Sequence, residues 1–359
     1  MKTFVVLLCL VVAAHAFKET LKTILKSPKK TRQLYKDFKA EQHLKFGSSL
    51  EEGKRYRQFK KNARFVALAN EHSTTTKFAL NFFSTMTRAE KRQYTGLNMT
   101  RHFANSPEFS PSLESHKDWL PFWESRIWTL EHWFVTKVSN QGRCGSSWAF
   151  AAVAALETRY RVETGVLRKF SEQEYLDCTY EEHKNEEGNK KDGCLGGHPS
   201  DCYTYTAKSG QLASLAQYPY TGRDGRCKTD RGNALIGAKI LGFVKVGCSE
   251  MENIKAIYHG SIFIALVATD SLYQYSKGIM KDTTCTGEPD HAVTAVGYTP
   301  EYILIKNSWG AQWGDRGFVR IARNNHRNCG MFEQSLYPKL VKTKRRDVSN
   351  SDPGVFYWF

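Results

Sequence analysis

Acidic residues are scarce in this 359-residue chain: 36 Asp and Glu stand against 52 Lys and Arg, a formal net charge of +16 at pH 7. No two cysteines are spaced as Cys-x-x-Cys, which argues against a structural zinc site. Past residue 16 no stretch is apolar and long enough to cross a bilayer. The sequence therefore predicts no metal, no cofactor and no membrane span.

The excess of basic residues is concentrated in one part of the chain. Residues 17–120 hold 21 Lys and Arg against 10 Asp and Glu, whereas the chain from residue 121 onwards holds 30 against 26. A basic surface can bind nucleic acid or a membrane. Because this segment is patterned as helices and has no nucleic-acid motif, we interpret it as a pro-segment and predict no nucleic-acid partner.

The first sixteen residues have the pattern of a secretory signal peptide. Lys2 supplies the charge, Phe4 to Val12 the apolar run, and Ala14-His15-Ala16 a small-x-small cleavage site. We expect the mature protein to be secreted or sorted to a lysosome-like acidic vesicle. Eight cysteines follow this segment, and an even number in an exported chain predicts disulfides without fixing their pairing.

Helices and strands are predicted in different parts of the chain. Residues 18–95 hold few helix breakers and read as helices. Later runs that are apolar or alternating, with β-branched and aromatic residues, read as strands. The predicted strands are 235–246, 261–269, 292–298, 302–306 and 317–322. This separation predicts an α+β protein with two lobes.

The stretch Asn140-Gln-Gly-Arg-Cys-Gly-Ser-Ser-Trp-Ala-Phe150 changes from a glycine-rich turn to an Ala-rich apolar run at helical spacing. Ala and Leu favour helix, so a helix should begin near Ser146 or Ser147. A side chain there feels the positive end of the helix dipole, which favours an anionic nucleophile.

This stretch resembles the active-site segment of papain-like cysteine peptidases, Gln-Gly-x-Cys-Gly-Ser-Cys-Trp-Ala-Phe, with Ser147 where that family has its nucleophilic cysteine. Two further motifs follow in the family's order, Asp290-His291-Ala292-Val293 and Asn307-Ser308-Trp309-Gly310. The resemblance implies that His291 is the base and Asn307 holds its tautomer under the indole of Trp309. Gln141 and the N–H of Ser147 would bind the oxyanion, and Ser147 should lie within hydrogen-bonding reach of His291.

The basic segment resembles the inhibitory pro-segment of cathepsin L-like peptidases. Its pattern is Glu51-x3-Arg55-x3-Phe59-x2-Asn62-x3-Val66-x3-Asn70, which lies on one helix face. A second family motif appears at residues 79–85 without its acidic end, so we do not expect the family's acid-triggered release. The resemblance implies a papain-like fold in four parts. They are a signal peptide (1–16), a helical pro-segment with its linker (17–120), a two-lobed peptidase domain (121–338) and a tail (339–359).

The substrate cleft is also assigned by resemblance. Gly196 and Gly197 should bind the substrate backbone, since glycine lets another chain approach closely. The main specificity pocket and its surroundings would be formed by His198, Ala265, Pro289, Asp290, Trp309 and Gln334. Expected partners are peptides or protein substrates, cystatin-like inhibitors and the chain's own pro-segment.

The family pattern implies three disulfides, Cys144–Cys194, Cys178–Cys227 and Cys285–Cys329. Cys202 and Cys248 remain, and we predict that they form a fourth.

Ser147 determines the functional prediction. A serine hydroxyl does not rest ionised as a thiol beside histidine does, so we predict a largely inactive homologue that still binds peptides. Four alternatives stay open at this point. The first alternative is an active hydrolase with a serine nucleophile, and the second is a protein that sequesters substrates or inhibitors. The third is a silica-condensing protein like the sponge silicateins, and the fourth is an engineered Cys-to-Ser variant.

Overall fold

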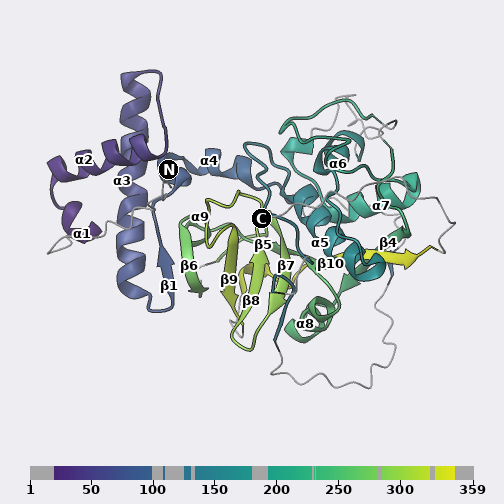
Figure 1. Ribbon diagram of the computed structural model, residues 1–359. Coiled ribbons are helices and arrows are strands. Elements are labelled where there is room, and N and C mark those ends of the chain that lie inside the picture. The colour runs from purple at the N-terminus through teal and green to yellow at the C-terminus, as the bar shows by residue number, and fades with distance from the viewer. Residues whose placement is uncertain are drawn as a thin grey trace, which may run out of the picture.

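The structure is a computed structural model, which describes residues 20–98, 108–109, 125–130, 134–179, 193–228, 230, 232–281, 285–323 and 328–343. The predicted signal peptide, the linker around residue 120 and the end of the tail lie outside these ranges, as does all but the first residue of a charged stretch (179–192) that the sequence predicts to be a solvated loop. Figure 1 shows three layers from left to right: the N-terminal helices, a sheet, and a group of helices around α5.

The N-terminal segment is a small helical unit, as predicted. It contains α1 (Leu21–Ile24), α2 (Pro28–Glu41), α3 (Ser49–His72), β1 (Thr76–Phe78), η1 (Phe82–Thr85), α4 (Arg88–Lys91) and η2 (Arg92–Tyr94). The predicted motif residues lie on α3 and each has a structural partner. Phe59 is fully buried, Asn62 donates to Ser84 O at 2.7 Å, and Arg55 pairs with Glu51 and Glu90. This part of the prediction is confirmed.

The helical lobe is built on α5 (Ser147–Thr164), which begins where the sequence predicts. The Ala-rich run lets the helix pack closely on its neighbours, and Trp148, Ala152 and Leu156 are fully buried. Around it lie α6 (Glu172–Cys178), η3 (Gly193–Leu195) and α7 (Pro199–Ser209). A left-handed Gly165 at φ +77° ends α5.

The second lobe is built on a sheet in the order β1-β6-β9-β8-β7-β5-β10-β4-β2, with β3 pairing to β7, to which the N-terminal segment contributes β1. Its strands are β2 (Glu108–Phe109), β3 (Arg126–Ile127), β4 (Ala238–Val246), β5 (Ile262–Leu266), β6 (Tyr275–Met280), β7 (His291–Tyr298), β8 (Tyr302–Lys306), β9 (Phe318–Ala322) and β10 (Ser335–Lys342). The short helices α8 (Glu250–Tyr258), α9 (Asp270–Tyr273) and η4 (Asn328–Gly330) connect them. All five predicted strands are present, and the α+β class is confirmed.

The three disulfides implied by the resemblance are present, Cys144–Cys194, Cys178–Cys227 and Cys285–Cys329. The predicted fourth bridge is wrong, because Cys202 and Cys248 are both free thiols. Cys202 is fully buried in the core of the helical lobe. Cys248 is exposed after β4, where its Sγ lies 3.8 Å from Glu333 O. The two thiols occupy different environments and do not meet.

Candidate active site

Ser147 is the first residue of α5 and has no exposed surface. Its neighbour Ser146 occupies the N-cap position without capping the helix through its side chain. The positive end of the α5 dipole therefore lies at Ser147 and gives it a positive local potential. This position suits a group that becomes negatively charged.

The hydroxyl of Ser147 is not hydrogen-bonded to the imidazole of His291. Its Oγ accepts a hydrogen bond from Ala292 N at 3.2 Å, one residue beyond the histidine. Nδ1 of His291 is buried and has no hydrogen-bond partner among the described residues. The hydroxyl therefore lies next to the residue that follows His291, and the expected hydrogen bond between Ser147 and the imidazole is absent.

Asn307 holds His291 as the resemblance implies. Nε2 of His291 lies 2.8 Å from Oδ1 of Asn307, and because a carboxamide oxygen only accepts, Nε2 carries the proton. Nδ1 is then the basic nitrogen. The indole of Trp309 stacks on the imidazole with ring centroids 4.6 Å apart. Burial lowers the pKa of His291 to about 4, against the smaller opposing effect of the Asn307 hydrogen bond.

This shifted pKa predicts how stability depends on pH. The unfolded histidine titrates near 6.5, so between pH 6.5 and about 4 the unfolded chain binds a proton that the folded chain does not. Stability should fall as the pH drops through this window, by about 3 kcal/mol in total. Urea unfolding at several pH values would measure it. His291→Gln should remove this contribution to the pH dependence of the free energy of unfolding. Parallel plots of unfolding free energy against pH for the parent and the variant would contradict the prediction.

The two donors expected to bind the oxyanion are both bonded to the N-terminal segment. Nε2 of Gln141 donates to Thr95 O at 3.1 Å, and the N–H of Ser147 donates to the same oxygen at 3.4 Å. Ser308 Oγ donates to Oε1 of Gln141 at 2.7 Å and fixes the amide. A carbonyl oxygen of the chain itself thus lies where a substrate carbonyl would develop charge.

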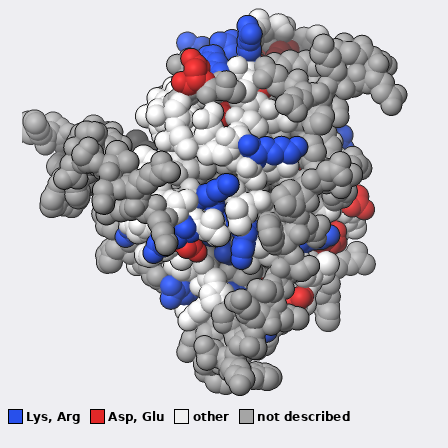
Figure 2. Space-filling view, turned by 90° about the vertical axis from the view of Figure 1, so that its right-hand side faces the viewer, with Lys and Arg blue, Asp and Glu red and all other residues white. Residues whose placement is uncertain are grey.

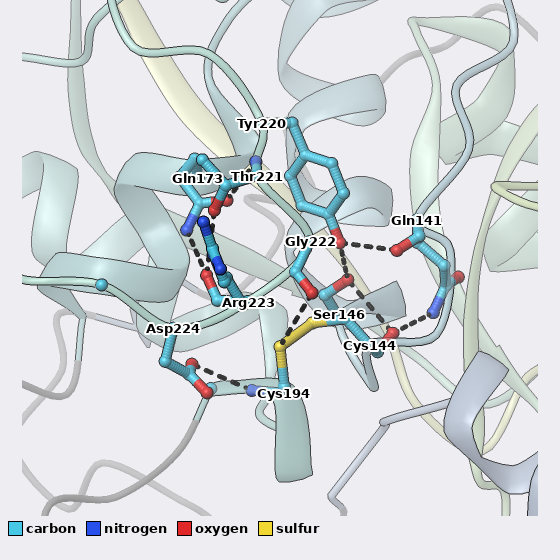
Figure 3. Close-up of a disulfide and its surroundings, with 12 residues drawn as sticks. Gln141, Cys144, Ser146, Gln173, Cys194, Tyr220, Thr221, Gly222, Arg223 and Asp224 are labelled. Atoms are coloured by element: carbon cyan, nitrogen blue, oxygen red, sulfur yellow. Dashed lines mark hydrogen bonds between the residues drawn. A yellow bond between two sulfur atoms is a disulfide. The ribbon is translucent and has the colours of Figure 1, made fainter.

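Figure 3 shows how the loop carrying these donors is held in place. The disulfide Cys144–Cys194 links this loop covalently to η3. The phenol of Tyr220 donates to Gln141 O at 2.7 Å and lies 2.9 Å from Ser146 Oγ. The Gln141 amide closes the loop by donating to Cys144 O at 2.9 Å. The donors are therefore fixed before any peptide binds.

The same segment continues through the cleft along Gly197. Gly197 N donates to Gly96 O at 3.0 Å and Asn98 N donates to Gly197 O at 2.9 Å, which makes a parallel bridge at Leu97. The N–H groups of Gly96 and Leu97 both donate to Asp290 O. The carbonyl oxygen of Asp290 therefore fixes the backbone of the segment directly after Thr95.

The predicted specificity pocket has a polar wall. His198 is buried and its Nδ1 accepts from Ser200 N, so its Nε2 carries the proton and donates to Oε1 of Gln334 at 2.8 Å. Ala265 is fully buried and belongs to the same apolar cluster as Leu97. Beside this cluster, the carboxylate of Asp290 accepts from Ala268 N at 2.8 Å, and burial raises its pKa.

The sequence reasoning did not single out Thr95, Gly96, Tyr220 or Ser308. The available signal was the glycine at position 96, directly after the predicted helical residues 18–95. Gly96 has φ of +127°, a backbone conformation that favours glycine. No group of three or more His, Cys, Asp or Glu in the described part of the chain is placed to hold a metal ion. Among the described helices, none combines the length and apolar composition that crossing a bilayer requires.

Known proteins share both the sequence and the arrangement. A family model described as "Papain family cysteine protease" matches residues 124–339. Bovine pro-cathepsin H is 33% identical over 83% of this chain and 87% of its own length. Papain from Carica papaya is 34% identical over 79% of this chain and 80% of its own length.

Solved proforms extend the likeness to the N-terminal segment. The proform of the ragweed pollen cysteine protease Amb a 11 has a TM-score of 0.76 at 29% identity, covering 92% of this chain and 100% of that one. Procathepsin L2 from Tenebrio molitor larvae has a TM-score of 0.74 at 30% identity, covering 86% of this chain and 99% of that one. The chain therefore belongs to the papain family of cysteine proteases, and it has the two-lobed fold of that family behind a helical pro-segment.

Proposed function

We propose that this protein is a secreted papain-family homologue that holds extended peptides in its cleft and hydrolyses them very slowly. The observation that supports it best is the hydrogen bonding of Ser147. Its Oγ accepts from Ala292 N while Nδ1 of His291 has no partner among the described residues. Gln141, Gly197 and Asp290 are bonded to an extended stretch of the chain's own backbone, whereas the step that would generate the nucleophile lacks its hydrogen bond.

The chemistry of oxygen supports low activity. A thiol beside histidine transfers its proton and rests as a thiolate. A serine hydroxyl is a far weaker acid and must lose its proton during attack, which needs a direct hydrogen bond to the base. In the chain that keeps its pro-segment, His291 is also a weak base, since burial lowers its pKa to about 4. Both facts disfavour attack by Ser147.

Peptide binding is supported by the pro-segment itself. In the bonds from residues 95–98 to the Gln141 side chain, Gly197 and Asp290, the pro-segment contributes only backbone atoms. Another extended chain can replace these bonds with its own backbone once the pro-segment has left. We propose peptides, protein substrates and cystatin-like inhibitors as partners, after removal of residues 17–120 in the secretory route or an acidic vesicle.

A test separates binding from turnover. Protein freed of its pro-segment should bind a cystatin-type inhibitor tightly while cleaving fluorogenic dipeptides at least about 10³-fold more slowly than an active family member. Turnover within tenfold of that member would refute the proposal. The competing candidate is a serine hydrolase, favoured by the free lone pair on His291 Nδ1. Rapid labelling of Ser147 by a serine-directed phosphonate would select it.

A further inference from the structure

A line of basic side chains runs along the outer face of α3, the long upright helix at the left of Figure 1. Lys54, Arg57, Lys61 and Arg64 are all exposed. At 100° per residue they lie on the side opposite Phe59, Asn62 and Val66, which are buried. We call these four residues the α3 basic stripe. It spans about 15 Å along the helix axis.

The α3 basic stripe has no ion-pair partner among the described residues, unlike four other cations of the pro-segment. Lys22, Lys39, Arg55 and Lys91 each form an ion pair. No described residue forms an ion pair with any stripe residue. Glu51, the acidic residue one turn before Lys54, is bonded to Arg55.

The spacing of the stripe makes it self-repelling. Successive members are three or four residues apart, the distance at which like charges on a helix destabilise it. Lys60, beside the stripe, adds a further cation and lies 5.0 Å from the Tyr56 ring centroid. An anionic ligand with regularly spaced charges would relieve this repulsion along the whole line.

We propose that the α3 basic stripe binds a linear sulfated polysaccharide. Its cations form a line rather than a pocket, which fits a ligand bearing an anionic group on successive sugars. Exposed Leu50 and Leu68 stand alone at its two ends, so the stripe lacks the continuous apolar face that a membrane-binding helix needs. It also offers no exposed aromatic platform for nucleotide bases.

The stripe lies on the pro-segment and faces away from the cleft, so this inference does not depend on the chemistry of Ser147. The end of the molecule seen in Figure 2, around the helical lobe, has a different distribution of charged side chains. Lys and Arg are scattered there and carboxylates lie among them. A chain that keeps its pro-segment would therefore be retained on a sulfated matrix, and the released domain would not.

The test is heparin affinity of the full chain, measured against salt concentration. Replacing all four stripe residues with Gln should lower the affinity at least about tenfold and make the slope of log affinity against log salt shallower by about three. Gln favours helix and removes the repulsion, so the variant should fold, which circular dichroism checks. The matched control replaces four exposed lysines of the other domain with Gln, Lys208, Lys239, Lys245 and Lys255. It should bind within twofold of the parent.

Three results would overturn the proposal. The first is an equal loss of affinity in both quadruple variants, which would assign binding to net charge alone. The second is unchanged affinity in the stripe variant. The third is preferential binding to anionic vesicles or to duplex DNA over heparin by the parent chain, with the same four residues required.

Discussion

Replacing Ser147 with Cys and removing the pro-segment is expected to raise peptide hydrolysis by about 10⁴-fold. The thiol would stand at the N-terminus of α5, next to Ala292 N, and Nδ1 of His291 has no partner among the described residues. The helix dipole lowers a thiol pKa and the imidazole takes its proton, so the nucleophile forms before substrate arrives. The oxyanion donors Gln141 and Ser147 N–H are already in place. Hydrolysis of fluorogenic dipeptides measures the gain.

Two variants control this experiment. Ser147→Ala should hydrolyse as slowly as the parent, because the hydroxyl contributes little. Ser147→Cys combined with His291→Ala should lose nearly all of the gain, because the thiol then has no base. If Ser147→Cys stays inactive while it still binds a cystatin-type inhibitor, the defect lies elsewhere in the site and the role assigned to Ser147 is wrong.

The parts of the site that lie in contiguous motifs were predictable from sequence. The start of α5 at Ser147 follows from a glycine-rich turn and an Ala-rich run, both local signals. The pairing of His291, the first residue of β7, with Asn307, which follows β8, was implied by the family motifs that carry the two residues. The strand 302–306 was predicted to the residue, because it is bounded by polar turn residues.

What the sequence could not provide depends on long-range packing. Strand β10 was missed because it contains Pro338, which normally argues against a strand, together with two lysines. The Cys202–Cys248 pairing failed because counting cysteines says nothing about which of them face each other. The hydrogen bond from Ala292 N to Ser147 Oγ joins residues 145 positions apart. Whether the hydroxyl points to the imidazole or to the backbone is a choice of side-chain geometry that no motif encodes.

Occupation of the cleft by the pro-segment depends on the absence of a side chain at Gly96. A Cβ at this position would lie 1.9 Å from Gly145 O and 2.2 Å from Gly145 C. Neither of these Gly145 atoms can move away easily, because Gly145 N donates a hydrogen bond to Cys194 O at 2.8 Å. Gly96→Ala should therefore push residues 95–98 out of the cleft and break their bonds to Gln141, Asp290 and Gly197.

The result expected for Gly96→Ala is an open cleft in the chain that keeps its pro-segment. In the Ser147→Cys background, a thiol-directed epoxide should label the variant at least about tenfold faster than its parent, equivalent to a loss of about 1.4 kcal/mol of pro-segment binding. Gly47→Ala is the matched control, because this glycine lies in the same segment and nothing lies within 4 Å of its Cβ position. Equal labelling rates in Ser147→Cys, Ser147→Cys/Gly96→Ala and Ser147→Cys/Gly47→Ala would mean that the contacts of residues 95–98 do not close the site. The helical part of the pro-segment around α3 would then block it alone.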